Sequence, residues 1–113
     1  MANSAKDFFD RFPHDLERMK EALPETVRGF GTLFQNAMKE GALTTKDKEL
    51  IALGIAVAQR CVPCINLHVQ KSLNAGARRE EILEATSVAV MMQGGPAYTH
   101  VAPVLDALEA LGK

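Results

Sequence analysis

Hydrophobic residues along this chain recur at helical spacing, and Gly and Pro residues separate the stretches that show this periodicity. Apolar residues spaced in this way form one face of an α-helix, whereas a half-buried strand needs strict alternation of apolar and polar residues. No stretch alternates in that way with β-branched enrichment, and the content of Ala, Leu, Glu and Lys favours helix. The pattern therefore predicts an all-α protein, a small helical bundle.

The first breaks define an N-terminal helical extension over residues 1–23. We expect two short amphipathic helices in it, over residues 4–12 and 14–22, because Pro13 interrupts the periodic pattern. Pro24 suits the first turn of a third helix, which runs to about residue 39 and is closed by Gly41 as a C-terminal cap.

Four further helices are expected after Gly41. Thr44 or Thr45 caps the next helix, which ends near residue 60. The following helix begins at the cysteines and stops at Gly76, and another covers residues 79–92. The last runs from the Gly94-Gly95-Pro96 break to about residue 111, so the cysteines lie at the bend of a helical hairpin.

A chain of 113 residues is near the usual single-domain size, so we expect one domain over residues 1–113. Two of the helices are apolar on more than one face, at residues 50–58 and 88–92. A chain of this size buries only about two thirds of its surface. Its other helices can surround one such apolar helix completely, but too little of the chain remains to surround a second. Homo-oligomerisation is therefore expected, and the alternative is that the N-terminal helices cover both faces.

Composition excludes several function classes. Hydrophobic residues make up 47% and charged residues 24%, and the formal net charge is -1 with both signs interspersed. This balance argues against a nucleic-acid partner or an anionic membrane surface. The N-terminus lacks the pattern of a secretory signal, and the longest apolar run, residues 50–58, is far below the roughly 18 residues that a membrane helix needs. We expect a cytoplasmic protein, in which a Cys-x-x-Cys pair favours catalysis or metal binding over a structural disulfide.

The segment RCVPCINLHV holds the only two cysteines of the chain, Cys61 and Cys64, followed by His68. On a helix that begins near Cys61, the three side chains lie along one face. Pro63 supports this start, because proline is tolerated in the first turn of a helix, where its missing N–H removes no hydrogen bond. Backbone N–H groups of that turn point toward the sulfurs and stabilise a thiolate.

Glu49 stands twelve residues before Cys61, on the preceding helix. A reversal of the chain near Arg60 would bring Glu49 level with His68 if the two helices pack antiparallel. The carboxylate and the imidazole could then pass a proton to or from Cys64. Glu49 is therefore a candidate site residue together with Cys61, Cys64 and His68.

The residues alone leave three interpretations of the cysteine pair open: a redox pair, a metal site or two inert buried thiols. Cys61, Cys64, His68 and Glu49 are four potential zinc ligands. Structural zinc sites usually take ligands from two separated pairs, however, and this chain has no second Cys or His pair. We therefore favour redox function and predict no metal.

The spacing Glu49-x11-Cys61-x2-Cys64-x3-His68, with LNAGARREEI from Leu73 to Ile82, resembles the alkylhydroperoxidase D branch of the carboxymuconolactone decarboxylase superfamily. The resemblance covers roughly residues 43–95. It implies an all-helical trimer or hexamer that reduces hydroperoxides by cycling between dithiol and disulfide, with no cofactor. An external dithiol or thiol protein would regenerate the thiols.

The same resemblance implies the role of each residue. Cys64 would be the peroxidatic nucleophile and Cys61 the resolving thiol, with Glu49 and His68 as proton relay. The sequence departs from the branch at Pro63, where its best-known members carry a histidine. The alternative function is a non-enzymatic helical oligomer that binds zinc or is regulated by redox state.

Overall fold

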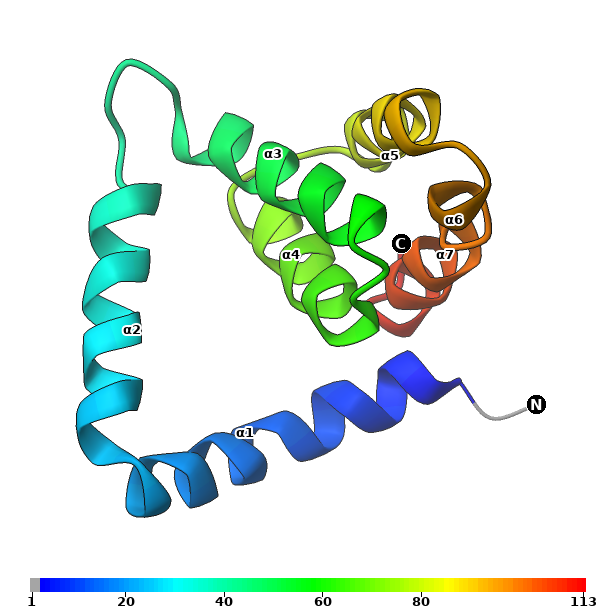
Figure 1. Ribbon diagram of the computed structural model, residues 1–113. Helices are drawn as coiled ribbons and strands as arrows, with labels where there is room; N and C mark the ends of the chain where they lie inside the picture. The colour runs from blue at the N-terminus through cyan, green and yellow to red at the C-terminus, as the bar shows by residue number, and fades with distance from the viewer. Residues whose placement is uncertain (1–2) are drawn as a thin grey trace.

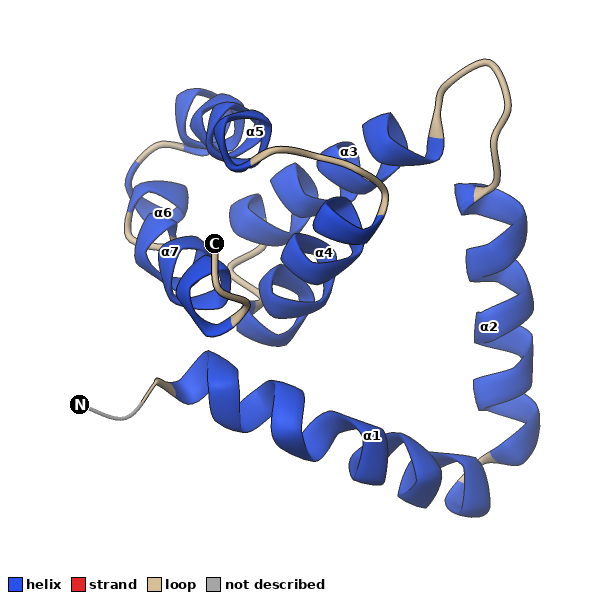
Figure 2. Ribbon diagram, turned by 180° about the vertical axis from the view of Figure 1, so that it is seen from behind, coloured by secondary structure: helices blue, strands red, loops and turns tan. Residues whose placement is uncertain are grey.

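The computed structural model describes residues 3–113 as seven helical segments joined by turns and short loops (Figure 1). These are α1 (Ser4–Ala22), α2 (Pro24–Met38), α3 (Thr45–Ala58), α4 (Val62–Asn74), α5 (Arg79–Gln93), α6 (Gly95–Tyr98) and α7 (Val101–Ala110). The all-α prediction is confirmed, since residues 3–113 contain helices and loops only (Figure 2). None of the helices in this range is both long and apolar enough to cross a bilayer.

The hydrophobic core lies between α3, α4, α5 and α7. The side chains that are fully buried there come from all four helices: Leu53, Val57, Ile65, Val69, Ile82, Val104 and Leu108. Burial of one such aliphatic side chain stabilises the fold by about 1.5–3 kcal/mol. Helices α3 and α4 follow each other in the chain and pack against each other, so they form the expected helical hairpin. Helix α3 also packs against α5.

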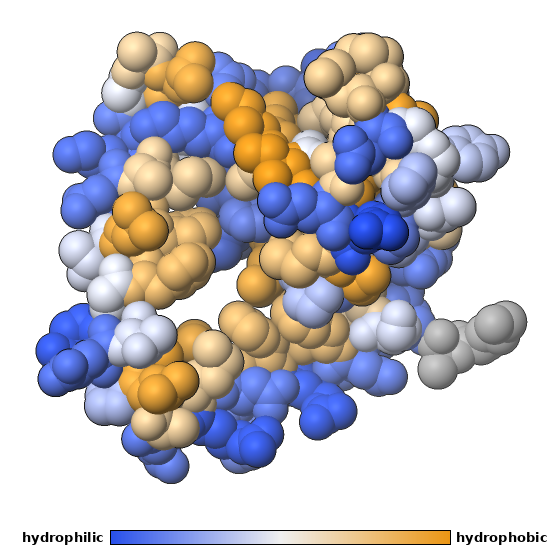
Figure 3. All heavy atoms as spheres, in the orientation of Figure 1, coloured by the Kyte–Doolittle hydropathy of each residue, from blue (hydrophilic) through white to orange (hydrophobic). Residues whose placement is uncertain are grey.

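Helices α1 and α2 form an arm, residues 4–38, that extends around two sides of the other helices (Figure 1). Ala5 is the only buried residue of α1, and α2 buries none of its residues. Asn3 fastens the start of the arm, because its side chain caps α1 and donates a 3.0 Å hydrogen bond to the Asp106 carbonyl of α7. Figure 3 shows an opening between the arm and the rest of the molecule, so the arm has few contacts within its own chain.

The predicted break at Pro13 is wrong, because α1 is one helix from Ser4 to Ala22 with Pro13 inside it. Proline removes the hydrogen bond to the carbonyl four residues earlier, here that of Phe9, and this normally ends or kinks a helix. Pro13 is exposed, so its ring crowds no packed neighbour and water can reach that side of the helix.

Two other helix ends also differ from the prediction. α2 ends at Met38, with Lys39 in extended conformation as its cap, and Gly41 lies in the following loop, where its N–H donates to the Leu43 carbonyl. The predicted last helix is divided into α6 and α7 by a turn at Thr99–His100. Within this turn the His100 ring nitrogen Nδ1 lies 2.8 Å from the Pro96 carbonyl, a local interaction that the hydrophobic pattern does not reveal.

Candidate redox site

The chain reverses direction between α3 and α4, as the sequence predicts. Arg60 adopts the left-handed region with φ 57°, which is uncommon for a residue other than glycine. The Cys61 N–H then donates to the Ala56 carbonyl across the turn at 3.1 Å. α4 begins immediately afterwards with Val62 and Pro63 in its first turn, so Cys61 is the N-cap residue.

Cys61 and Cys64 are joined by a disulfide bond, and their Cα atoms lie 5.2 Å apart. The backbone N–H of Cys64 donates to the Cys61 sulfur at 3.3 Å, which is the capping interaction of this helix. Cys64 is half-buried and packs against the hydrophobic core. The first-turn N–H therefore favours a thiolate on Cys61, whereas Cys64 has the core on one side.

Glu49 on α3 and His68 on α4 form a direct contact, with 2.7 Å between Glu49 Oε1 and His68 Nδ1. The Glu49 side chain is only 5% exposed and that of His68 18%. A carboxylate can only accept a hydrogen bond, so the tautomer of His68 that fits this contact carries its proton on Nδ1 and donates it to Glu49. His68 then presents its other ring nitrogen, Nε2, as a proton acceptor.

The four predicted site residues all lie on the α3–α4 hairpin, Cys61 and Cys64 at its bend and the Glu49–His68 pair further along it. Cys64 and His68 stand four residues apart on α4, so both lie on the same face of that helix. Glu49 reaches that face from α3. Cys61 reaches it through the disulfide bond. The hairpin therefore carries a disulfide-forming cysteine pair at its bend and a Glu–His pair whose histidine shares a helix with Cys64.

Two further residues at this site were missed by the sequence analysis. The Phe34 ring of α2 stacks on the His68 imidazole, with centroids 6.1 Å apart and an angle of 18° between the rings. The Lys71 ammonium, one turn after His68, lies 4.8 Å from the centroid of the same Phe34 ring. A phenylalanine on an amphipathic helix predicts ordinary packing, and nothing in the sequence links it to a histidine 34 positions later.

The described residues show no arrangement typical of a metal centre. Over residues 3–113, no three or more His, Cys, Asp or Glu side chains are grouped so that they could hold a metal ion. Both sulfurs are engaged in the disulfide.

An all-helical chain whose central hairpin carries a disulfide-forming cysteine pair beside a Glu–His pair defines a class: small helical proteins with a candidate thiol–disulfide site. The profile of the Carboxymuconolactone decarboxylase family matches residues 24–107. This chain belongs to that family. The matched region begins with α2 and includes every residue of the candidate site.

Solved structures of the family have the same fold. A carboxymuconolactone decarboxylase family protein from Legionella pneumophila is 38% identical, with a TM-score of 0.90 over 99% of this chain and 100% of that one. A family protein from Thermotoga maritima, whose description suggests a role in an antioxidative response, is 27% identical, with a TM-score of 0.81 over 94% of this chain and 90% of its own.

Curated relatives extend the similarity in sequence. An uncharacterized protein from Cupriavidus necator is 31% identical over 91 residues, which is 80% of each chain. Uncharacterized protein 4 in the cox locus of Paracoccus denitrificans is 34% identical over 103 residues, 85% of this chain and 93% of its own.

Proposed function

We propose that this protein is a thiol-dependent peroxidase or disulfide oxidoreductase that works through a Cys61–Cys64 dithiol–disulfide cycle. The observation that carries the proposal is the Cys61–Cys64 disulfide on the same helix as His68, which Glu49 holds at 2.7 Å. Family membership and the antioxidative role suggested for the Thermotoga maritima relative support a redox activity of this kind.

In the proposed reaction, His68 Nε2 accepts the Cys64 proton, and the thiolate attacks the terminal oxygen of a hydroperoxide. The S–O bond forms as the O–O bond breaks, and the leaving alkoxide takes the proton back from His68 to depart as alcohol. The Cys61 thiol then gives its proton to His68, its sulfur attacks the resulting Cys64 sulfenic acid, and the hydroxide released takes that proton and leaves as water as the disulfide forms. An external dithiol or thiol protein returns both cysteines to thiols by disulfide exchange.

The choice of Cys64 as the attacking sulfur depends on its base. The N–H directed at Cys61 would favour the first cysteine as thiolate. Cys64 shares its helix face with His68, four residues later, and a nucleophile needs a base within reach. We therefore propose Cys64 as nucleophile and Cys61 as resolving thiol.

Single-cysteine variants test both the function and the roles. Peroxide should lower the mass of the reduced wild-type protein by about 2 Da through disulfide formation. Cys61→Ser should accumulate a sulfenic acid on Cys64, detectable with a dimedone probe, and still consume one equivalent of peroxide. Cys64→Ser should not react. An active Cys64→Ser beside an inert Cys61→Ser would reverse the roles, and peroxide consumption by both variants at the wild-type rate would refute the proposed function.

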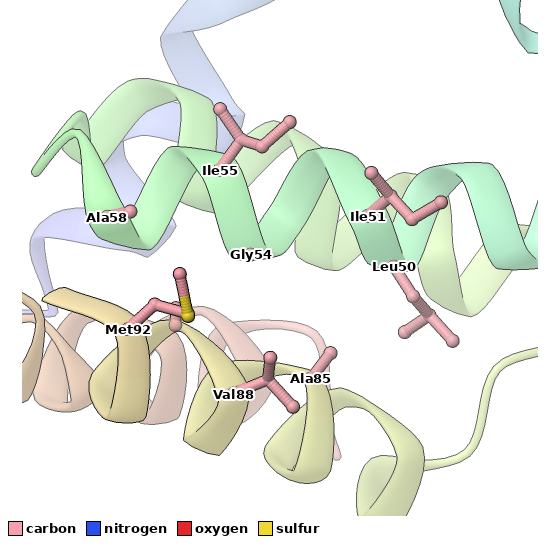
Figure 4. A pocket seen from close by; sticks show the side chains of 9 residues that line it. Leu50, Ile51, Gly54, Ile55, Ala58, Ala85, Val88 and Met92 are labelled. Atoms are coloured by element: carbon pink, nitrogen blue, oxygen red, sulfur yellow. The ribbon is translucent and has the colours of Figure 1, made fainter.

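We also propose that the chain assembles as a homotrimer or homohexamer in the cytoplasm. An open groove of about 440 Å³ runs between α3 and α5, with Gly54 and Ala85 among its small lining residues (Figure 4). Large apolar side chains at and beside it remain exposed, Val88 at 57% and Met92 at 73%. Exposed apolar surface of this kind marks association sites, and the two helices involved are those whose sequences are apolar on more than one face.

A further inference from the structure

We propose that Phe34 is a positioning residue for His68, which it acts on by holding the plane of the imidazole ring. This inference rests on the proposed redox function and adds to it a residue from α2, outside the hairpin that carries the cysteines. The observation behind it is the Phe34–His68 stack, with 6.1 Å between centroids and 18° between ring planes. Such offset stacking lies within the range of about 4.5–7 Å in which aromatic rings attract each other.

The position of Phe34 is not explained by core packing. Phe34 is half-buried, yet it belongs neither to the hydrophobic core nor to the side chains packed against it. The helix that carries it buries no residue, and its neighbour Phe30 remains 65% exposed. The ring of Phe34 is instead covered by two residues of one face of α4, His68 and Lys71.

The stack supplies a restraint that Glu49 cannot supply. The hydrogen bond from Nδ1 to Glu49 fixes one edge of the imidazole but permits the ring to tilt about that bond. Phe34 stacks on the ring in an offset, nearly parallel arrangement and limits this tilt. Together the two contacts fix the direction in which Nε2 points, which is what a base on the same helix face as Cys64 requires. The Phe34 ring is itself held by a cation–π interaction, because the Lys71 ammonium lies 4.8 Å from its centroid.

The experiment compares Phe34→Leu, which keeps apolar volume but removes the ring face, with Phe34→Tyr, which retains the ring. Phe30→Leu is the matched control, since it makes the same substitution one turn earlier on α2 at an exposed position. The readout is the rate of peroxide-driven disulfide formation, followed as the mass loss of about 2 Da at several pH values. His68→Ala gives the rate without the base.

We expect Phe34→Leu to lower the rate near neutral pH about tenfold, because small displacements of a catalytic group have effects of this size or larger. Phe34→Tyr and Phe30→Leu should keep the wild-type rate. Above about pH 9 most cysteine thiols ionise without a base, so the rates of Phe34→Leu and wild type should converge there. Phe34→Leu should add nothing further to His68→Ala.

Two results would overturn the inference, and they separate its failure from that of the proposed relay. If His68→Ala is slow but Phe34→Leu is as fast as Phe30→Leu, or is slowed equally at every pH, Phe34 does not position the base. If His68→Ala itself reacts at the wild-type rate, the proton relay of the proposed function fails, and the role of Phe34 fails with it.

Discussion

The buried carboxylate of Glu49 lies 2.7 Å from Nδ1 of His68, although 19 positions separate the two residues in sequence. The contact exists because α3 and α4 are antiparallel neighbours connected by the tight turn at Arg60. It gives the buried carboxylate of Glu49 the hydrogen-bond partner that a buried polar group requires.

This pair predicts that Glu49→Gln slows peroxide-driven disulfide formation. The amide keeps the shape of the side chain but removes the acceptor-only carboxylate that fixes Nδ1–H, so Nε2 is no longer held as the acceptor. General-base catalysis contributes about 10²–10⁴-fold, and we expect the loss of its orienting group to cost about ten- to a hundredfold in rate. The rate of the mass loss of about 2 Da measures it.

The control for Glu49→Gln is Glu84→Gln, which makes the same change at an exposed position of α5. Circular dichroism of both variants checks that the helices are intact. A wild-type rate for Glu49→Gln would show that the carboxylate serves stability alone.

The turn at Arg60 predicts a stabilising substitution. At φ 57° a residue with a side chain costs the folded state about 1–2 kcal/mol relative to glycine. Glycine loses more conformational freedom on folding, and this offsets part of the gain from removing the side chain. Arg60→Gly should therefore raise the free energy of unfolding by about 0.5–1 kcal/mol. Thermal and urea denaturation measure this, and Arg60→Ala, which keeps a Cβ at the same backbone geometry, should show no gain. Equal stability of the glycine and alanine variants would contradict strain at this turn.

Acid stability should depend on Glu81, at the start of α5. A backbone N–H bond from Arg78, and then the ammonium of Lys46 at 2.9 Å, lower the pKa of the Glu81 carboxyl below its ordinary value of 4.5. A lowered folded-state pKa contributes stability that is present above about pH 4.5 and is lost as pH falls through the folded-state value. The wild type should therefore exceed Glu81→Gln in unfolding free energy at pH 6, and the difference should shrink below pH 4.5.

Urea denaturation of wild type and Glu81→Gln across this pH range measures the effect. Lys46→Met should reproduce part of the loss, because the backbone N–H and the guanidinium of Arg78 still lower the pKa of Glu81. A stability difference between wild type and Glu81→Gln that does not change with pH would show that the carboxylate charge plays no part.

The groove between α3 and α5 predicts where a charge disrupts assembly. Val88→Asp places a carboxylate on the exposed apolar face, which should convert the oligomer to a monomer at micromolar concentration because the charge would be buried at the interface. Ala102→Asp, at an exposed position of α7, adds the same charge elsewhere and should leave the assembly intact.

Light scattering coupled to size-exclusion chromatography measures the mass of each variant. The same run on reduced and peroxide-treated wild type separates an enzyme from a redox-regulated oligomer. We expect one mass in both states, and a change of assembly on oxidation would favour the regulated oligomer. A monomeric wild type would exclude the proposed trimer and hexamer.

Local physical chemistry made much of this protein predictable from sequence. Helical periodicity gave the all-α class, and Pro63 together with the three- and four-residue spacings placed Cys61, Cys64 and His68 at the start and on one face of α4. Thr44 was among the two expected caps of α3, and its hydroxyl accepts the Asp47 N–H. These features depend on residues within a few positions of each other, so the sequence shows them directly.

The tertiary structure decided what depends on distant residues. Pro13 remains inside α1 because this part of the arm is exposed, a condition that the sequence does not show. Phe34 reaches His68 only because the arm returns α2 to the face of α4. A spacing pattern reports which side chains share a helix face, whereas contact between faces depends on turns and packing summed over the whole chain. The sequence by itself therefore determined the all-α class and the cysteine motif, and the fold determined where several helices begin and end and which partners surround His68.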